Sequence, residues 1–279
     1  KRTVIIGAGG QLGRALQAVL PDAATLDLPD FDVTDAEQVA AIDWKQYGTI
    51  INAAAYTAVD AAETPSGRAD CWAANVTGVA ALCRVATEHR ITLVHISSDY
   101  VFDGTRAEHT EDEPISPLGV YGQTKAAGDV LVGQVPQHYL VRTSWVIGDG
   151  RNFVRTMADL AARGVSPTVV ADQYGRLTFT EDLAAGVIHL LTAGAAWGTY
   201  NLSNTGPIQS WAEIAQEVFE LRGRSRSDIT PISTDEYSAG KAVAPRPRNS
   251  ALRLDKMVAT GWTPAAAADR LAAYVARLT

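Results

Sequence analysis

The first half of the chain alternates short apolar runs with longer segments in which alanine, leucine and valine recur every three or four residues. The apolar runs predict buried strands at RTVIIG (2–7), TIINAAA (49–55), TLVHISS (92–98) and HYLVRTSWV (138–146). The longer segments have helical spacing, and they predict helices at GQLGRALQAVL (10–20), DAEQVAAI (35–42), SGRADCWAANVTGVAALCRVATEHR (66–90) and VYGQTKAAGDVLVG (120–133). Because strands alternate with helices, we expect an α/β fold, a doubly wound parallel sheet of the Rossmann type covered on both faces.

Beyond Trp145 the pattern changes to amphipathic helices separated by turn-rich joins such as SNTGP (203–207) and APRPRNS (244–250). These helices are predicted at NFVRTMADLAARG (152–164), TEDLAAGVIHLLTAG (180–194) and SWAEIAQEVFELRG (210–223). We interpret this part as a smaller α+β region at the mouth of the sheet. We expect a dinucleotide-binding domain of residues 1–150 and 176–204, and a substrate domain of residues 151–175 and 205–279.

Composition narrows the class of protein. Of the 279 residues, 47% are hydrophobic, which is enough for a large core. The 31 acidic residues outnumber the 24 Lys and Arg residues, and the formal net charge is −7. We therefore expect no nucleic-acid partner and no anionic membrane partner. The two cysteines form no disulfide framework, and no apolar run reaches the roughly 20 residues that span a bilayer, so we expect a cytoplasmic location.

The stretch GAGGQLG directly follows the first predicted strand and opens the first predicted helix. Within it, Gly7, Gly10 and Gly13 have GxxGxxG spacing. The first glycine permits a tight turn, the second lets the backbone approach a pyrophosphate, and the third lets the helix pack on the strand. A merely glycine-rich turn is the alternative, but strand, glycines and helix stand in the order that a dinucleotide-binding loop requires.

Charged and small residues after this loop bear on the cofactor. Asp27 stands about 20 residues after the first strand, where a carboxylate binds the ribose hydroxyls and repels a 2′-phosphate. Arg14 favours the phosphorylated cofactor instead. Asp32 either begins a helix or contacts the adenine, and both interpretations stay open. The small residues of NAAAYTAVD (52–60) either let a cofactor cross the strand edge or pack tightly against a helix.

The stretch VYGQTK places Tyr121 four residues before Lys125, so both side chains project from one helix face. A lysine ammonium beside a phenol favours the phenolate and lowers its pKa from about 10. Such a tyrosine can pass a proton to a carbonyl oxygen. Ser98, at the end of a predicted strand, is placed to bind the same oxygen. Two ordinary surface residues are the alternative, but the dinucleotide loop upstream favours the catalytic interpretation.

Together these residues resemble the dTDP-4-dehydrorhamnose reductase family of the extended short-chain dehydrogenase/reductase superfamily. The similarity spans nearly the whole chain and rests on GAGGQLG, NAAAYTAVDAAE, ANVTG, SSDYVFDGT, PLGVYGQTKAAGD, RTSWV, NF, ADQYG and RPRNSAL. The resemblance implies a catalytic triad of Ser98, Tyr121 and Lys125. It implies that the sugar nucleotide is bound by Ser98, Asp99, Trp145 and Asn152. With the glycine loop, the cofactor-binding positions are Gly7, Gly10, Gln11, Leu12, Gly13, Asp27, Asp32, Val33, Ala55, Tyr56, Thr57, Tyr121 and Lys125.

The activity that the resemblance implies is reduction of the 4-keto group of dTDP-4-dehydro-L-rhamnose to dTDP-L-rhamnose. NADPH is the expected cofactor, with NADH also accepted. A reductase acting on another dTDP-4-keto-6-deoxysugar and a non-catalytic cofactor-binding regulatory subunit are the alternatives. A dehydratase or epimerase of the same superfamily is less favoured, because Asp99 is followed by Tyr100 and not by a second acid.

Three further side chains carry open interpretations. Trp145 either stacks on the sugar or nicotinamide, or is a core aromatic at a strand end. Arg246 and Arg248 either clamp the substrate diphosphate, to which guanidinium groups are suited, or lie in a solvated loop.

The oligomeric state is predicted from one position at which this sequence differs from the family. Some members dimerise through Mg²⁺ held by glutamates, but Ala15 takes the first of these positions, and Glu181 is left without partners. We therefore expect no bound metal and a monomer or weak dimer. The chain begins at Lys1 without a methionine, which leaves open a fusion to, or contact with, an upstream 3,5-epimerase.

Overall fold

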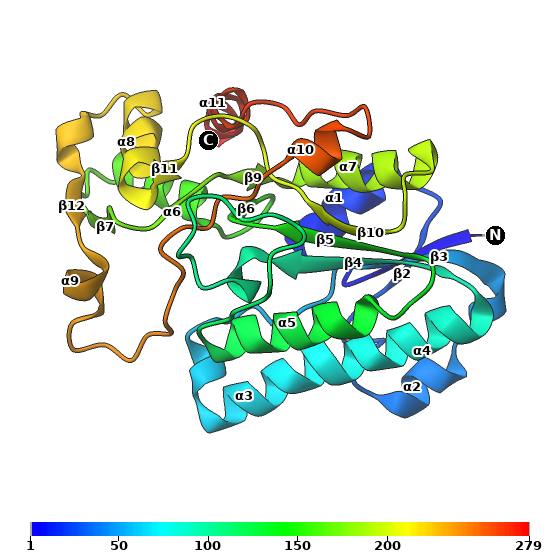
Figure 1. Cartoon of the computed structure of the whole chain (residues 1–279). Coiled ribbons are helices and arrows are strands. Elements are labelled where there is room, and N and C mark those ends of the chain that lie inside the picture. The colour runs from blue at the N-terminus through cyan, green and yellow to red at the C-terminus, as the bar shows by residue number, and fades with distance from the viewer. Residues whose placement is uncertain (1, 279) are drawn as a thin grey trace.

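The structure is a computed structural model that describes residues 2–278. Its centre is a six-stranded sheet in which every strand pair is parallel (Figure 1). From edge to edge the strands are β10 (Gly198–Asn201), β5 (His138–Thr143), β4 (Thr92–Ser98), β3 (Tyr47–Asn52), β1 (Arg2–Ile6) and β2 (Ala24–Leu26). The predicted doubly wound sheet is confirmed, and the four predicted strands are among these six.

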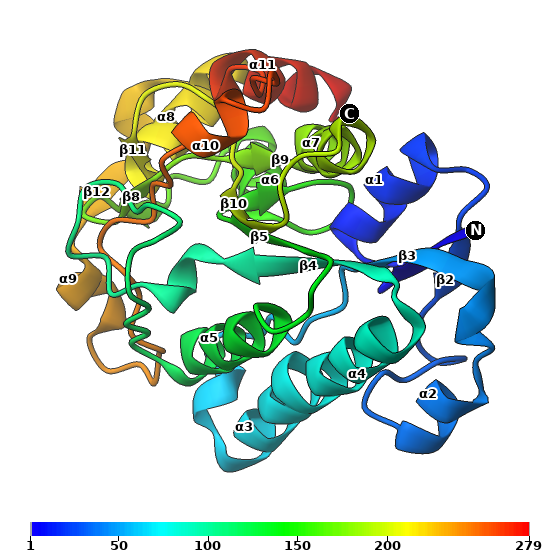
Figure 2. The same ribbon diagram turned by 45° about the vertical axis from the view of Figure 1, so that its right-hand side comes forward.

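Helices cover both faces of the sheet. The helices on one face are α1 (Gln11–Val19) and α7 (Thr180–Ala193), and those on the other are α2 (Ala36–Ala41), α3 (Pro65–Trp72), α4 (Val79–His89) and α5 (Val120–Val132) (Figures 1 and 2). The segment predicted as one long helix is interrupted between α3 and α4 by a π-helical turn, Ala73–Gly78.

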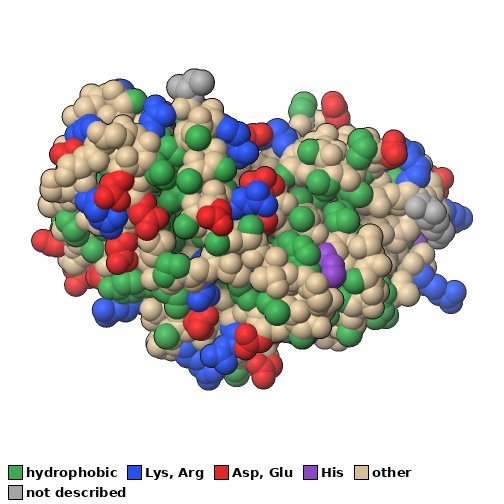
Figure 3. Space-filling model, turned by 90° about the horizontal axis from the view of Figure 1, so that it is seen from above, with side chains coloured by type: hydrophobic (Ala, Val, Ile, Leu, Met, Phe, Trp, Pro, Cys, Tyr) green, Lys and Arg blue, Asp and Glu red, His purple; other side chains and the backbone are tan. Residues whose placement is uncertain are grey.

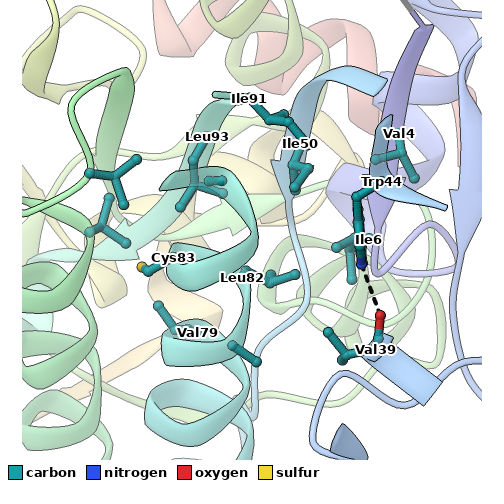
Figure 4. Packing of buried hydrophobic residues seen from close by; sticks show 14 of the residues in the cluster. Val4, Ile6, Val39, Trp44, Ile50, Val79, Leu82, Cys83, Ile91 and Leu93 are labelled. Atoms are coloured by element: carbon teal, nitrogen blue, oxygen red, sulfur yellow. Dashed lines mark hydrogen bonds between the residues drawn. The ribbon is translucent and has the colours of Figure 1, made fainter. Parts of the chain in front are cut away.

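The hydrophobic core follows the two-residue period of the strands. Ile6 and Ile50 face the layer of α2 and α4, whereas their neighbours Ile5 and Ile51 face the layer of α1 and α7. In the first layer, Val79, Leu82 and Cys83 of α4 pack toward the sheet, and the Trp44 indole donates to the Val39 carbonyl oxygen at 2.8 Å (Figure 4). Both faces of the sheet are therefore buried, as expected for parallel strands.

A second hydrophobic core lies beside the carboxyl ends of the strands. It is built mainly on α6 (Phe153–Ala162), α8 (Trp211–Leu221) and α11 (Ala267–Arg277). The remaining elements are short, namely β6 (Val146–Ile147), β7 (Thr168–Val170), β8 (Tyr174–Gly175), β9 (Thr178–Phe179), β11 (Gln209–Ser210), β12 (Thr230–Ile232), α9 (Thr234–Ser238) and α10 (Asp255–Val258). Because α7 and β10 belong to the large sheet layer, residues 183–202 pack with the first half of the chain, whereas Leu177 and Phe179 belong to the second core. The division into two functional domains stays a prediction.

The surface carries charges of both signs. On the face seen from above, acidic and basic side chains are interspersed (Figure 3). Within residues 2–278, no helix combines the length and apolar character needed to cross a membrane.

Candidate functional site

The glycine-rich loop lies where the strand order reverses. β2 pairs with one edge of β1 and β3 with the other, and open α/β sheets bind ligands at such a point. Gly7 has a φ of +78°, and a Cβ there would lie 2.5 Å from the Ala54 nitrogen. A Cβ at Gly13 would lie 2.2 Å from the Gly7 carbonyl oxygen. Both positions therefore require glycine, and the loop fits the close backbone approach that a dinucleotide needs.

Asp27 and Arg14 both hold this loop. The Asp27 carboxylate accepts hydrogen bonds from the Gly9 and Leu28 backbone N–H groups, the latter at 2.9 Å. The Arg14 guanidinium donates to the carbonyl oxygens of Gly9 and Asp149. Asp27 thus binds the backbone N–H of Gly9, and Arg14 binds the carbonyl oxygen of the same glycine. The opposing effects of Asp27 and Arg14 on the choice between NADPH and NADH stay a prediction.

A cavity of about 300 Å³ extends from the loop along the ends of β1 and β3. The predicted cofactor positions that line it are Gly7, Gly10, Asp27, Asp32, Val33, Ala55 and Tyr56. The Asp32 carboxylate accepts from the Thr34 N–H at 2.8 Å and from its hydroxyl at 2.7 Å. Asp35, and not Asp32, caps α2, so the helix-start interpretation of Asp32 is wrong.

The π-helical turn supplies a residue that the sequence analysis did not single out. The Asn75 side-chain oxygen accepts from the Tyr56 N–H at 2.9 Å, and its nitrogen donates to the Tyr56 carbonyl oxygen at 3.0 Å. The same nitrogen donates to the Thr124 hydroxyl on α5 at 3.1 Å. Asn75 thus fixes the segment Ala55–Thr57 against the helix that carries Tyr121. The feature of the sequence that could have indicated Asn75 is the ANVTG stretch, which forms the π-helical turn. Such turns are frequent at functional sites.

A cleft of about 440 Å³ opens at the carboxyl ends of β4 and β5. Ser98 ends β4, whereas Tyr121 and Lys125 lie one turn apart on α5, as their spacing predicted. All three side chains line this cleft. The other predicted positions that line it are Gly10, Gln11, Leu12, Ala55, Thr57, Asp99 and Trp145. The structure therefore brings the predicted catalytic residues next to the glycine-rich loop.

Burial controls the protonation of the two α5 residues. It raises the pKa of the Tyr121 hydroxyl above its usual range, and a hydrogen bond with Ser98 opposes the rise. It lowers the pKa of the Lys125 ammonium to about 8, although the Asp129 carboxylate opposes the fall. The net shift of the Tyr121 pKa is therefore upward, opposite to the lowering that the sequence predicted. A phenol that stays protonated is the form that can donate a proton.

Asp99 is a buried acid in the same cleft. Burial raises the pKa of its carboxyl to about 7, against hydrogen bonds from Ser250 and Ser98 that favour the carboxylate. The Ser98 hydroxyl donates to one of its oxygens at 3.2 Å. Asp99 therefore lies beside the predicted carbonyl-binding serine and changes its charge near neutral pH.

Two stacked tryptophans line the same cleft. The Trp145 ring stacks on the Trp211 ring with centroids 3.7 Å apart and an interplanar angle of 20°. Trp145 has a φ of +47°, which a bulky residue rarely adopts, and a Cβ at Gly175 would lie 2.9 Å from its ring. Both indoles line the cleft. Trp211 was missed because it stands at the start of an ordinary amphipathic helix.

Asn152 and Arg246 make contacts within the protein. Asn152 caps α6 by accepting from the Arg155 N–H at 2.9 Å, and it donates to the Tyr274 hydroxyl at 2.7 Å. Arg246 forms a two-pronged ion pair with Asp60 at 2.9 and 3.0 Å. This ion pair lies in a partly exposed loop, so both interpretations of Arg246 and Arg248 stay open. The roles of Asn152 and Arg246 in substrate binding stay predictions.

Glu181 has cationic neighbours. Its carboxylate lies 3.6 Å from the Arg270 guanidinium and 4.0 Å from that of Arg277. These neighbours are cations, and not the glutamate co-ligands that a bridging metal would need. Among residues 2–278, no three His, Cys, Asp or Glu side chains gather in a group that could hold a metal ion, and Ala15 has no ligating atom.

Comparison with known proteins agrees with this geometry. The family model described as the RmlD substrate binding domain matches residues 1–279. A dTDP-4-dehydrorhamnose reductase of Aggregatibacter actinomycetemcomitans is 37% identical over 275 residues, covering 92% of each chain. A probable dTDP-4,6-dihydroxy-2-methyloxan-3-one 4-ketoreductase of Streptomyces antibioticus is 38% identical, covering 94% of this chain and 90% of its own. The crystal structure of dTDP-4-dehydrorhamnose reductase from Bacillus anthracis in complex with NADP superposes with a TM-score of 0.91 at 33% identity, covering 100% of this chain and 99% of that chain.

Proposed function

The chain belongs to the RmlD substrate-binding-domain family, and from this premise we propose that it reduces dTDP-4-dehydro-L-rhamnose to dTDP-L-rhamnose with NADPH. The observation that carries the proposal is the single cleft shared by Ser98, Tyr121, Lys125 and the glycine-rich loop. Gly10 and Ala55 line the part of this cleft that would hold the nicotinamide cofactor, which when bound would supply the hydride for C4 of the sugar.

The protein side chains manage the proton and the orientation of the carbonyl. Tyr121, kept protonated by burial, donates its proton to the carbonyl oxygen as negative charge develops there. The Ser98 hydroxyl binds the same oxygen and orients it. Lys125 lies one helical turn further along α5 and lines the same cleft, and its positive charge would favour the phenolate once the proton has left.

The choice between NADPH and NADH follows from Asp27 and Arg14. Asp27 repels a 2′-phosphate, whereas Arg14 attracts it, and the two bind the same Gly9. We expect both cofactors to support turnover. Steady-state kinetics with each cofactor test this, and a preference of more than about a thousandfold, on the order of 4 kcal/mol, contradicts it.

On the substrate side, the Trp145 and Trp211 rings offer an apolar wall for the deoxysugar. The Arg246 and Arg248 guanidinium groups are the candidates for the diphosphate. In this arrangement residues 1–150 and 176–204 bind the cofactor, while residues 151–175 and 205–279 bind the sugar nucleotide.

A second candidate is reduction of another dTDP-4-keto-6-deoxysugar. It is favoured by relatives named for other 4-ketoreductions, such as a dTDP-4-keto-6-deoxy-D-glucose reductase of Streptomyces niveus that is 35% identical. The decisive experiment follows NADPH oxidation with each 4-keto sugar and determines the C4 configuration of the product. If none is reduced, the protein is a non-catalytic cofactor-binding subunit.

For its setting, we propose a cytoplasmic monomer or weak dimer without Mg²⁺, since Glu181 is neutralised by arginines. An upstream 3,5-epimerase remains the proposed neighbour, because that activity supplies the 4-keto substrate.

A further inference from the structure

The helix that carries Tyr121 begins without a capping side chain of its own. α5 starts at Val120, and its N-cap residue, Gly119, has no side chain that could accept a hydrogen bond. Instead, the carboxylate of Glu63 accepts from the Val120 N–H at 2.8 Å, from 57 residues earlier in the sequence. A carboxylate at this end also interacts favourably with the helix dipole.

The approach of Glu63 to the helix is close and depends on glycine. A Cβ at Gly119 would lie 2.7 Å from the Glu63 carboxylate oxygen and 3.4 Å from Pro245. The segments that contain Glu63, Gly119 and Pro245 therefore meet at the start of α5. Tyr121 is the next residue along the helix, so its position depends on this junction.

The segment that contains Glu63 is itself fixed at its other end. Asp60 accepts from the Ala244 N–H at 2.9 Å, and it holds Arg246 by two hydrogen bonds. Asp60 precedes the 3₁₀ turn Ala61–Glu63 as its N-cap residue, and Glu63 is the last residue of the turn, which follows the predicted cofactor segment Ala55–Thr57. This turn thus connects the cofactor side of the cleft, the catalytic helix and the loop at 244–246.

We propose that Glu63 is a positioning residue that fixes the first turn of α5 and thereby aims the Tyr121 hydroxyl into the cleft. Glu63 lines neither the cleft nor the cavity at the glycine-rich loop, and it acts through the Val120 N–H. The expected effect of Glu63 on the reaction rate depends on the proposed reductase function. The expected effect of Glu63 on the first turn of α5 does not depend on that function. A displacement of about 1 Å at a reacting group can cost on the order of a hundredfold in rate.

The first test compares three variants of the full chain. Glu63→Ala is expected to lower kcat by about 10- to 100-fold with cofactor affinity and KM little changed. Glu63→Gln keeps an oxygen that accepts from Val120, and it should restore kcat to within roughly threefold of wild type. The matched control is Asp228→Ala, which removes a carboxylate that accepts from the Ser225 N–H at 3.3 Å, at the N-cap of the 3₁₀ turn Arg226–Asp228. This control should lose stability without losing kcat.

The second test does not need turnover. Hydrogen exchange of the Val120 amide should accelerate in Glu63→Ala but not in Asp228→Ala. A double-mutant cycle completes the argument: Gly119→Ala, whose Cβ would displace Glu63, should lower kcat in the wild type and add little in the Glu63→Ala background. A kcat for Glu63→Ala within twofold of wild type, an equal loss in Asp228→Ala, or unchanged Val120 exchange each overturns the proposal. If the wild-type protein reduces no 4-keto sugar, the proposed function fails while Val120 exchange still decides the role of Glu63.

Discussion

The ammonium nitrogen of Lys125 lies 2.6 Å from the carbonyl oxygen of Ile96, to which it donates a hydrogen bond. This bond joins α5 to β4, two residues before Ser98, and the Lys125 side chain is almost completely buried. Burial is the reason that the pKa of Lys125 falls to about 8. The site therefore contains a cation that titrates within the range in which enzymes are assayed.

The first prediction concerns the alkaline limb of the pH profile. Above pH 8 the free enzyme loses the Lys125 proton, and with it the charge that favours the Tyr121 phenolate, so kcat/KM should fall as pH rises. In Lys125→Met the rate should be lower throughout and this limb should disappear, because kcat/KM profiles report groups of the free enzyme. Lys125→Arg, which stays charged, is the control and should shift the limb beyond pH 10. An unchanged limb in Lys125→Met would assign it to another group.

The second prediction concerns the proton donor. Tyr121→Phe keeps the ring that meets Tyr100 edge-on, with centroids 5.5 Å apart, so folding and cofactor binding should persist. Loss of the hydroxyl should lower kcat by about 10²- to 10⁴-fold, the usual contribution of general acid catalysis. Single-turnover measurements with a fluorescence titration of the cofactor separate the two effects. Tyr139→Phe, which removes a hydroxyl bound to the Ala195 carbonyl oxygen, is the matched control and should keep its kcat. A Tyr121→Phe enzyme with more than about a tenth of wild-type kcat is incompatible with this role.

How far the sequence predicts the fold depends on the length of each pattern. The buried strand at 92–98 and the helix at 120–132 were found at nearly their observed bounds, because each spans several periods. Strands of two or three residues, such as β6 and β9, contain no period and were missed. Their pairing is set by tertiary contact, which local propensity does not record.

The residues of the candidate site also fall into two groups, those that the sequence predicts and those that only the folded structure shows. Ser98, Tyr121 and Lys125 were found because their spacing and the strand end carry the geometry. Glu63 was not, since its partner Val120 lies 57 residues away and only folding brings the two together. The direction of the Tyr121 pKa was also missed, because the effect of burial depends on the packing around the phenol and not on sequence spacing.

The third prediction concerns metal and assembly. Arg270 and Arg277 already neutralise Glu181, and Ala15 offers no ligand, so removing divalent ions should change neither oligomeric state nor rate. Light scattering and turnover with EDTA, and then with added Mg²⁺, test this directly. Arg277→Ala, which frees one side of Glu181, is an informative comparison. A dimer of the wild type that dissociates on chelation would show that a metal bridge exists.

The last prediction uses the buried carboxyl of Asp99 as a probe of stability. Its pKa is raised to about 7 in the folded protein, whereas an unfolded chain has the ordinary value near 3.9. Between these values the folded state holds a proton that the unfolded state releases, so wild-type stability from this group falls as pH rises, by about 1.4 kcal/mol per pH unit. Asp99→Asn has no such proton.

Relative to wild type, Asp99→Asn should therefore gain stability steadily from about pH 4 to pH 7 and gain nothing further above pH 7. Urea unfolding of both proteins at several pH values measures the difference, and other titrating groups cancel because they are shared. Ser98→Ala is the control, since it removes a hydrogen bond to the same carboxyl without removing the proton, and it should retain the wild-type slope. A difference between Asp99→Asn and wild type that is the same at pH 5 and pH 8 would mean that Asp99 is ionised throughout, and its burial would then need a cation to compensate it.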